Sequence, residues 1–168
     1  MRLRAWEPED AGAAAALYDH PEVLSGLTST WPQGIPGVKR WIEEGAGKDD
    51  ALRLVVERLD EGVLLGAISL GEIEAPQRTG LLGLWVGEPF WDSGYGTDAL
   101  RTLCRFAFDH MNMHRIELSV LATNARAIHA YEKVGFALEG TRRQAEFVGG
   151  EHVDAHIMGL LAGDLLEG

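Results

Sequence analysis

The stretch that decides the fold of this chain is Trp91-Asp92-Ser93-Gly94-Tyr95-Gly96-Thr97, which opens directly into Asp98-Ala99-Leu100-Arg101. The apolar run Leu81-Leu82-Gly83-Leu84-Trp85-Val86 precedes it and predicts a strand. The residues that follow predict a helix over 95–111, because apolar side chains recur there at helical spacing, at Leu100, Leu103, Cys104, Ala107 and Met111. A strand, a glycine turn and a helix N-terminus in this order can bind phosphate, since backbone N–H groups and the helix dipole converge there. A single Gly-x-Gly turn is equally compatible with an ordinary tight connection.

A second strand–helix unit follows further along the chain. Arg115-Ile116-Glu117-Leu118-Ser119-Val120-Leu121 predicts a strand, and residues 124–134 predict a helix. Asn124 is expected to cap the start of this helix and Gly135 to end it.

Together the two units resemble the GNAT superfamily of acyl-CoA-dependent N-acyltransferases. The glycine turn is similar to that family's Q/R-x-x-G-x-G/A pyrophosphate loop, and residues 124–136 are similar to its N-x-x-A-x-x-x-Y-E-K-x-G-F segment. Trp91 stands where the loop usually has Gln or Arg. Tryptophan at this place, the opening Leu3–Asp10 and the ending Glu139–Leu161 resemble the RimJ/RimL-like (ribosomal-protein-alanine N-acetyltransferase) branch.

The pattern of elements predicts one domain over residues 1–168. Strands are expected at about 1–6, 51–58, 63–72, 80–87, 115–121, 137–147 and 152–160, and helices at about 7–18, 38–44, 95–111 and 124–134, with 21–37 mostly loop. The order β-α-α-β-β-β-α-β-α-β-β indicates an α/β (α+β) fold with a mixed central sheet. The resemblance implies that strands 80–87 and 115–121 run parallel and splay apart. The pantetheine arm would enter the gap, and the acceptor amine would approach from the opposite side.

The resemblance also implies which residues bind the cosubstrate acetyl-CoA. They are Leu84, Trp85, Val86, Trp91, Asp92, Ser93, Gly94, Tyr95, Gly96, Thr97, Asn124 and Lys133. Asn124 would contact the pantetheine amides. Lys133 would meet a phosphate or ribose group, or it is a solvated helix charge. Arg101, Arg105 and Arg126 lie near the same elements and are further candidates for a local positive patch.

Acyl transfer to an amine needs an acid for the leaving thiolate and a base for the amine proton. Tyr131 is the candidate acid, because the family's motif places a tyrosine beside the thioester sulfur; the alternative is that it only packs on its helical neighbours. Some family members place a basic glutamate where this chain has Ser119, and Glu117 lies two residues earlier on the same strand face. Other carboxylates near strand ends are Glu72, Glu74 and Glu88.

The composition of the chain limits which partners and which location can be expected. Acidic residues outnumber basic ones by 26 to 15, for a net charge of −11, which argues against nonspecific nucleic-acid binding and is compatible with a cationic acceptor. No apolar run approaches a membrane span, and Cys104 is the only cysteine, so a cytoplasmic location is expected and Cys104 is expected to be a core residue. A homodimer is expected by analogy with the branch.

A metal is not expected. His152, Asp154 and His156 alternate along the last predicted strand with a spacing that zinc accepts, but Asp154 can instead pair with Arg142 or Arg143. Trp31 and Trp41 flank the region that lines the acceptor cleft in the family, and core positions are the commoner role for tryptophan.

The sequence therefore predicts an N-acetyltransferase that moves an acetyl group from acetyl-CoA to a primary amine by direct attack in a ternary complex. The acceptor is open: a protein N-terminus or a small amine. One alternative is a noncatalytic acyl-CoA-binding module of the same fold. Another is a nucleotide-binding protein of a different fold, although the chain lacks the G-x-G-x-x-G pattern.

Overall fold

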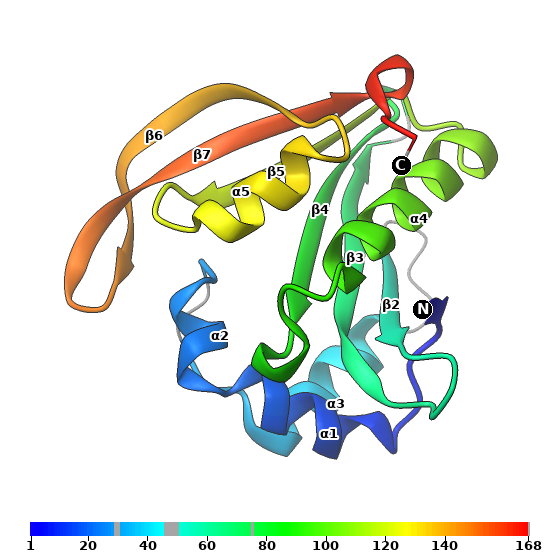
Figure 1. The fold of residues 1–168 in the computed structure, drawn as a ribbon, viewed down its shortest axis with the longest axis vertical. Helices are drawn as coiled ribbons and strands as arrows, with labels where there is room; N and C mark the ends of the chain where they lie inside the picture. The colour runs from blue at the N-terminus through cyan, green and yellow to red at the C-terminus, as the bar shows by residue number, and fades with distance from the viewer. Residues whose placement is uncertain (29–30, 46–50, 75, 168) are drawn as a thin grey trace.

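The computed structural model describes residues 1–28, 31–45, 51–74 and 76–167, and its centre is one mixed sheet of seven strands (Figure 1). The strands lie in the order β1-β2-β3-β4-β5-β7-β6. Every neighbouring pair is antiparallel except β4 and β5, which are parallel. The strands are β1 Arg2–Arg4, β2 Leu52–Glu57, β3 Leu64–Glu74, β4 Thr79–Val86, β5 Arg115–Leu121, β6 Ala137–Val148 and β7 Glu151–Leu161.

Five helices pack around this sheet: α1 Asp10–Tyr18, α2 Pro21–Ser25, α3 Gly34–Gly45, α4 Tyr95–His110 and α5 Ala125–Glu132. Two short 3-10 turns, Glu88–Phe90 and Ala162–Asp164, complete the elements. The prediction that residues 21–37 are mostly loop was wrong, because α2 and the first turn of α3 lie there. Pro21 and Pro36 sit in first turns, where proline is tolerated since those N–H groups have no intrahelical partner.

The sheet separates two hydrophobic cores. Alternate residues of a strand face opposite sides, and in β2 Val55 packs with α1 and α3 while Val56 packs with α4. The larger core lies under α4 and α5 and includes Leu65, Leu70, Leu100, Leu103, Ile116 and Leu118. Cys104 lies in it with no exposed surface, and burial raises the pKa of its thiol to about 12. The prediction that Cys104 is a core residue is confirmed.

The parallel pair β4 and β5 is joined over a short length only. Three residue pairs register the two strands, ending at Leu81 and Glu117, although both strands continue well beyond this point. The strands therefore diverge toward their C-terminal ends, and Figure 1 shows α5 in front of this opening. The predicted splayed parallel pair is confirmed.

The two predicted caps of α5 are also confirmed. The Asn124 side-chain oxygen accepts a hydrogen bond from the Ala127 N–H at 3.1 Å. Gly135 follows the helix with φ +111°, and a Cβ there would lie 2.1 Å from the carbonyl oxygen of Asp164, so only glycine fits.

An ion-pair network joins β1 to the start of α1 and to β2. Arg4 binds both carboxylate oxygens of Asp10, at 2.7 and 2.8 Å, and donates to Glu57 at 2.7 Å. Arg2 also binds Glu57. Hydrogen bonds from these guanidinium groups lower the pKa of Asp10 and of Glu57. The network fastens the start of α1 to β1 and β2. Among the helices in the described ranges, none is both long and apolar enough to cross a membrane.

Candidate active site

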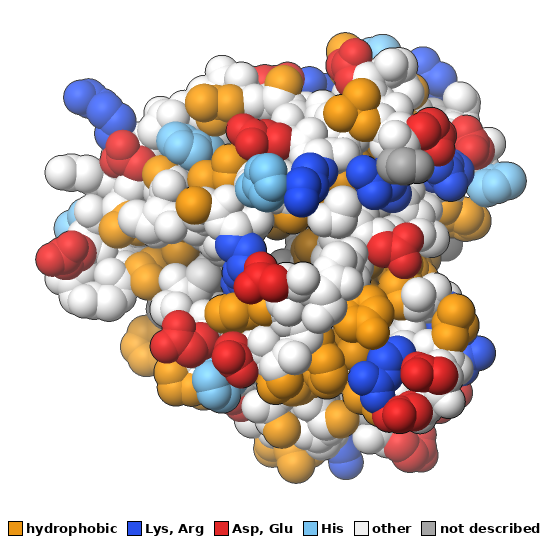
Figure 2. Space-filling model, viewed as in Figure 1, with side chains coloured by type: hydrophobic (Ala, Val, Ile, Leu, Met, Phe, Trp, Pro, Cys, Tyr) orange, Lys and Arg blue, Asp and Glu red, His pale blue; other side chains and the backbone are white. Residues whose placement is uncertain are grey.

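A cleft of about 720 Å³ lies between the end of β4, the glycine turn and α5. It is lined by all of the predicted cofactor-binding residues except Ser93: Leu84, Trp85, Val86, Trp91, Asp92, Gly94, Tyr95, Gly96, Thr97, Asn124 and Lys133. The Ser93 hydroxyl instead donates to the Trp91 carbonyl oxygen at 3.2 Å. Figure 2 shows the hollow near the centre of this face, with Lys or Arg and Asp or Glu side chains beside it.

The first turn of α4 presents free backbone donors to this cleft. No side chain caps the helix, and the first N–H to bond back is that of Asp98, to the Gly94 carbonyl oxygen at 3.0 Å. The N–H groups of Tyr95, Gly96 and Thr97 come earlier and have no partner within the helix. Gly94 turns the chain with φ +81°, and a Cβ there would meet nothing within 4 Å. This arrangement suits a phosphate group at the positive end of the helix dipole.

Trp91 and Arg126 form a second part of the anion site. The Trp91 indole N–H donates to the Val86 carbonyl oxygen at 2.7 Å, which fixes the loop to the end of β4. The Arg126 guanidinium carbon lies 3.3 Å from the centroid of the Trp91 ring, in cation–π geometry. The glycine turn lacks the usual Gln or Arg at position 91, and Arg126 brings a basic group to the same place from α5.

Two of the other basic candidates serve a different purpose. Arg101 donates to the carbonyl oxygens of Leu166 and Lys133, at 3.2 and 3.1 Å, and Arg105 pairs with Glu167. Both hold the C-terminal segment against α4 and do not line the cleft, whereas Arg126 and Lys133 do. The sequence alone could not distinguish these two arginines from the two basic residues that line the cleft, because the C-terminal segment returns to α4 from far along the chain.

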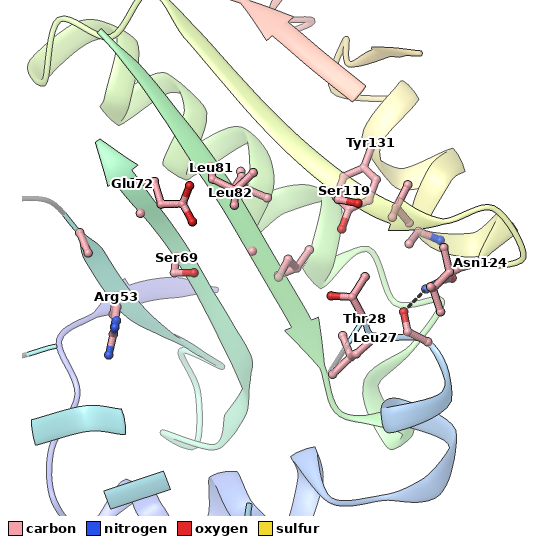
Figure 3. A pocket seen from close by; sticks show the side chains of 18 of the residues that line it. Leu27, Thr28, Arg53, Ser69, Glu72, Leu81, Leu82, Ser119, Asn124 and Tyr131 are labelled. Atoms are coloured by element: carbon pink, nitrogen blue, oxygen red, sulfur yellow. Dashed lines mark hydrogen bonds between the residues drawn. The ribbon is translucent and has the colours of Figure 1, made fainter. Parts of the chain in front are cut away.

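A second pocket, of about 520 Å³, crosses the sheet at the opening between β4 and β5. Tyr131 and Asn124 line both this pocket and the cleft, so the two spaces meet at α5. Figure 3 shows Tyr131, Ser119 and Asn124 on one side of the pocket, with Arg53, Ser69 and Glu72 on the other. The Asn124 amide donates to the Gly26 carbonyl oxygen at 3.0 Å, which ties the residues after α2 to α5.

Tyr131 lies at the meeting point of the two spaces. Its side chain is only 7% exposed and its ring packs edge-on against Phe136, with the ring centroids 5.8 Å apart. Burial raises the pKa of Tyr131 to about 12, so the hydroxyl carries its proton at neutral pH. Packing and proton donation are therefore compatible in one side chain.

The two candidate bases on β5 are separated by the structure. Ser119 lines the pocket, and its hydroxyl is buried with no hydrogen-bond partner among the described residues. Glu117 belongs to the last rung that still pairs with β4, and it accepts a hydrogen bond from Arg115 at 2.8 Å. Arg115 also binds Glu139. Glu117 is therefore held outside the pocket, whereas Ser119 is among the residues that line it.

Of the other carboxylates, Glu72 lines the pocket and Glu74 and Glu88 do not. A β-bulge opposite β4 explains why Glu72 lines the pocket. The register shifts between Gly71 and Glu74, and Glu72 has φ +49°. Simple alternation would put Glu72 on the face of the buried Leu70. The bulge breaks the alternation, so that Glu72 shares the pocket with Ser69 and Gly71. Sequence reasoning missed this because a bulge leaves no periodic signal.

The alternating residues on β7 have structural partners. Asp154 accepts a hydrogen bond from the Gln144 backbone N–H at 2.8 Å, and the His156 Nδ1 lies 2.9 Å from the Thr141 hydroxyl. In the part of the chain that the structure describes, no three His, Cys, Asp or Glu side chains gather as a metal site would require. Trp41 lines the pocket, and Trp31 is 77% exposed and lies outside it.

A parallel strand pair opens beside an uncapped helix N-terminus, with a buried tyrosine at the opening, and this arrangement suits an acyltransferase. The acetyltransferase (GNAT) domain matches residues 1–137, and the chain belongs to this family. The family match and the named relatives together identify the chain as an acetyl-CoA-dependent acetyltransferase.

The relatives carry different acceptors in their names. The L-amino acid N-acetyltransferase AaaT of Escherichia coli (strain K12) is 28% identical over 158 residues, covering 93% of this chain and 94% of the relative. The spermidine N(1)-acetyltransferase of the same strain is 29% identical over 155 residues, covering 92% and 82%. The fold is that of the Vibrio cholerae spermidine N-acetyltransferase in complex with CoA and spermine, with a TM-score of 0.89 at 23% identity over 97% of this chain and 96% of that one.

Proposed function

We propose that this protein transfers an acetyl group from acetyl-CoA to a primary amine by direct attack in a ternary complex. The observation that carries the proposal is the continuous space from the α4 N-terminus, past Tyr131, to the far face of the sheet. A donor held on one face and an acceptor on the other meet at the opening between β4 and β5. Holding two reactants in this way supplies much of the rate enhancement in such reactions.

Each residue has a role in this scheme. The free N–H groups of the α4 first turn bind the pyrophosphate, with Arg126 and Lys133 adding positive charge. The acceptor nitrogen forms a bond to the acetyl carbon as the carbon–sulfur bond breaks. Tyr131 donates its proton to the departing thiolate, from a hydroxyl that is protonated at neutral pH.

The amine must lose a proton to attack, and two groups on the pocket wall support this step. Ser119 offers a buried hydroxyl that has no hydrogen-bond partner among the described residues, which suits a hydrogen bond to the amine or to an ordered water. Glu72 is the acidic residue among the described residues that line the pocket and is exposed, so a proton passed to it leaves readily to solvent. We assign Ser119 to positioning and Glu72 to accepting the proton through water.

The acceptor named for the relatives ranges from amino acids to spermidine, so a primary amine is the common chemistry. The RimJ/RimL-like branch would add protein N-termini, supported by the tryptophan in the glycine turn and by the chain's opening and ending segments. A homodimer in the cytoplasm is proposed by the same analogy.

The test is a thiol-release assay with acetyl-CoA and a panel of amino acids, amino acid amides, spermidine and peptides with free N-termini. Because Cys104 is buried, a thiol reagent should report released CoA with little background from the protein. Release that depends on the amine supports transfer. Tight acetyl-CoA binding without release for any amine would favour the noncatalytic acyl-CoA-binding module instead.

A further inference from the structure

The junction where the donor cleft meets the pocket has one wall that the catalytic scheme leaves unused. The residues that line both spaces come from three parts of the chain: Leu84 from β4, Asn124, Ala127 and Tyr131 from α5, and Gly26 and Leu27 from the segment after α2. The reacting acyl carbon lies at this junction in the proposed scheme, because CoA reaches it from the cleft and the amine reaches it from the pocket. The segment after α2 therefore supplies one side of the reaction space from a distant part of the chain.

An apolar side pocket of about 390 Å³ opens from the same junction. Leu27 and Leu84 line this side pocket as well as the cleft and the pocket. Among the described residues, the walls of the side pocket include no charged side chain and four aromatic ones: Trp6, Tyr18, Trp41 and Trp85. A space of this kind binds apolar groups. An acyl chain longer than acetyl would fit there if it could pass the two leucines.

The two leucines are held in different ways. Leu84 pairs with Ile68 between β4 and β3, and its side chain packs against the larger hydrophobic core. A Cβ on Gly96 would lie 3.8 Å from Leu84 Cδ2, so the Leu84 side chain also lies close to the first turn of α4. Leu27 is half-buried and, within the described ranges, packs with neither hydrophobic core. Because Leu27 lines all three cavities instead, its side chain is a partition between the junction and the side pocket.

A hydrogen bond from the start of α5 fixes the position of Leu27. The Asn124 amide donates to the carbonyl oxygen of Gly26, one residue before Leu27, at 3.0 Å. A Cβ on Gly26 would lie only 3.1 Å from Asn124 Nδ2, so glycine permits this close approach. At the base of the same segment, the Asp19 carboxylate accepts the backbone N–H groups of residues 33–34, at 2.7 and 2.8 Å. Figure 3 shows the Asn124 bond as a dashed line, with Leu27 close to it.

We propose that Leu27 limits the transferred acyl group to acetyl, and that the hydrogen bond from Asn124 to Gly26 holds Leu27 in this role. The proposal rests on the proposed acetyltransferase function and names the residue that selects its donor. During transfer the nitrogen–carbon bond forms and the carbon–sulfur bond breaks, and Leu27 lies beside the methyl group of the acetyl. Butyryl-CoA carries two more methylene groups, which Leu27 keeps out of the side pocket. Truncation of Leu27 to alanine removes enough side chain to admit them.

The experiment compares butyryl-CoA with acetyl-CoA in the thiol-release assay, with the amine of the panel that gives the fastest release. In the unaltered protein kcat/KM for butyryl-CoA should be roughly 10- to 100-fold lower than for acetyl-CoA, since the fit of a methylene group in a pocket changes kcat/KM by about 10-fold or more. In Leu27→Ala the ratio of butyryl-CoA to acetyl-CoA values should rise by at least about 10-fold. A general loss of stability would lower both values and leave their ratio unchanged.

Leu24→Ala is the matched control, because Leu24 is a half-buried leucine of α2 outside the linings of all three cavities. It should leave the ratio unchanged. Gly26→Ala tests the hydrogen bond and keeps Leu27, because the added Cβ would displace the Asn124 amide. The ratio should rise roughly 3- to 10-fold in this variant, since a hydrogen bond contributes about that much.

An unchanged ratio in Leu27→Ala, or an equal rise in Leu24→Ala, would overturn the role of Leu27 and leave the acetyltransferase function intact. Equal use of the two donors by the unaltered protein would do the same, and this comparison needs no variant to fold. An unchanged ratio in Gly26→Ala would overturn the role of the Asn124 bond. Absence of thiol release with every donor and amine would overturn the proposed function itself. Calorimetry would then test Leu27 without turnover, through the same shift in the ratio of the butyryl-CoA and acetyl-CoA affinities.

Discussion

The donor side of the molecule is built from neighbouring stretches of chain, whereas the acceptor side is assembled from distant ones. Residues 79–134 supply β4, the glycine turn, α4, β5 and α5, and most of the cleft lies within them. The acceptor side draws on α1, α3, β2 and β3, which come together only in the folded protein (Figure 1). We propose that the first binds its ligand through backbone N–H groups and the second through side chains.

This difference explains why relatives of one fold carry different acceptors in their names. A backbone donor site tolerates substitution, as Trp91 in the pyrophosphate turn illustrates, because the N–H groups stay in place whatever the side chain. A side-chain site changes its ligand when one residue changes. Acceptor chemistry is therefore expected to depend on the side chains that line the pocket rather than on the fold.

The largest effect is expected at the α4 first turn. A Cβ at Gly96 would meet only ordinary contacts at 3.8 Å, so Gly96→Glu should fold while placing bulk and negative charge where the pyrophosphate binds. Acetyl-CoA affinity should fall by more than about 10³-fold, since several charge-assisted hydrogen bonds are lost. Calorimetry measures this. Gly12→Glu adds the same group to an exposed helical glycine with open space around it and should bind normally. Unchanged affinity in a folded Gly96→Glu protein would remove the site.

Tyr131→Phe tests the junction between the two sides. The ring stays packed on Phe136 and only the hydroxyl is removed. If the hydroxyl protonates the thiolate, kcat should fall by roughly 10²–10³-fold while acetyl-CoA affinity stays nearly constant. Because the pKa of Tyr131 is about 12, the unaltered enzyme should show no loss of activity from its ionisation below about pH 11. Full turnover in Tyr131→Phe would remove the acid role and leave the fold assignment standing.

The Arg126→Gln variant tests whether acetyl-CoA binding on the donor side depends on a side chain. The guanidinium stacks on Trp91 and lines the cleft, so its loss should weaken acetyl-CoA binding roughly 5- to 20-fold, a smaller effect than that of Gly96→Glu. Arg105→Gln is the matched control, because Arg105 pairs with Glu167 away from the cleft. Equal affinities for the two variants in calorimetry would show that backbone groups alone bind the donor.

The smallest expected effect is on the free energy of unfolding, through the ion pairs of Asp10 and Glu57 with Arg4. The folded pKa values of Asp10 and Glu57 are lowered, so their ion pairs with Arg4 stabilise the protein fully above the unfolded values of about 4 and lose this contribution as the pH falls through the folded values. Asp10→Asn should lower the free energy of unfolding at pH 7 by about 1–2 kcal/mol and flatten its decline in acid.

Leu100→Ala, in the core beneath the donor side, should instead lower the free energy of unfolding by about 2–4 kcal/mol at every pH. Urea unfolding followed by circular dichroism between pH 3 and 7 distinguishes the two patterns. An Asp10→Asn protein with the pH dependence of the unaltered chain would show that this carboxylate does not anchor α1.

The sequence was sufficient for the parts that local patterns encode. The glycine turn, the Asn124 cap and the Gly135 stop follow from motifs of consecutive residues, and the diverging strands follow from the family resemblance that these motifs support. Glu72 could not be placed, because a bulge turns it to the other face, and Arg53 and Arg126 lie on elements whose packing partners are far away in the chain. Helix α2 was missed because prolines and glycines that start helices give the same signal as a loop.

The central claim is that donor and acceptor meet at the opening between β4 and β5, beside Tyr131. A crystal structure of the protein with bound CoA tests it most directly. We expect the pyrophosphate on the N–H groups of residues 95–97, the pantetheine between β4 and β5, and the CoA sulfur within about 3.5 Å of the Tyr131 hydroxyl, within the range of weak hydrogen bonds to sulfur. A pantetheine arm that leaves the opening empty, with the sulfur far from Tyr131, would contradict it.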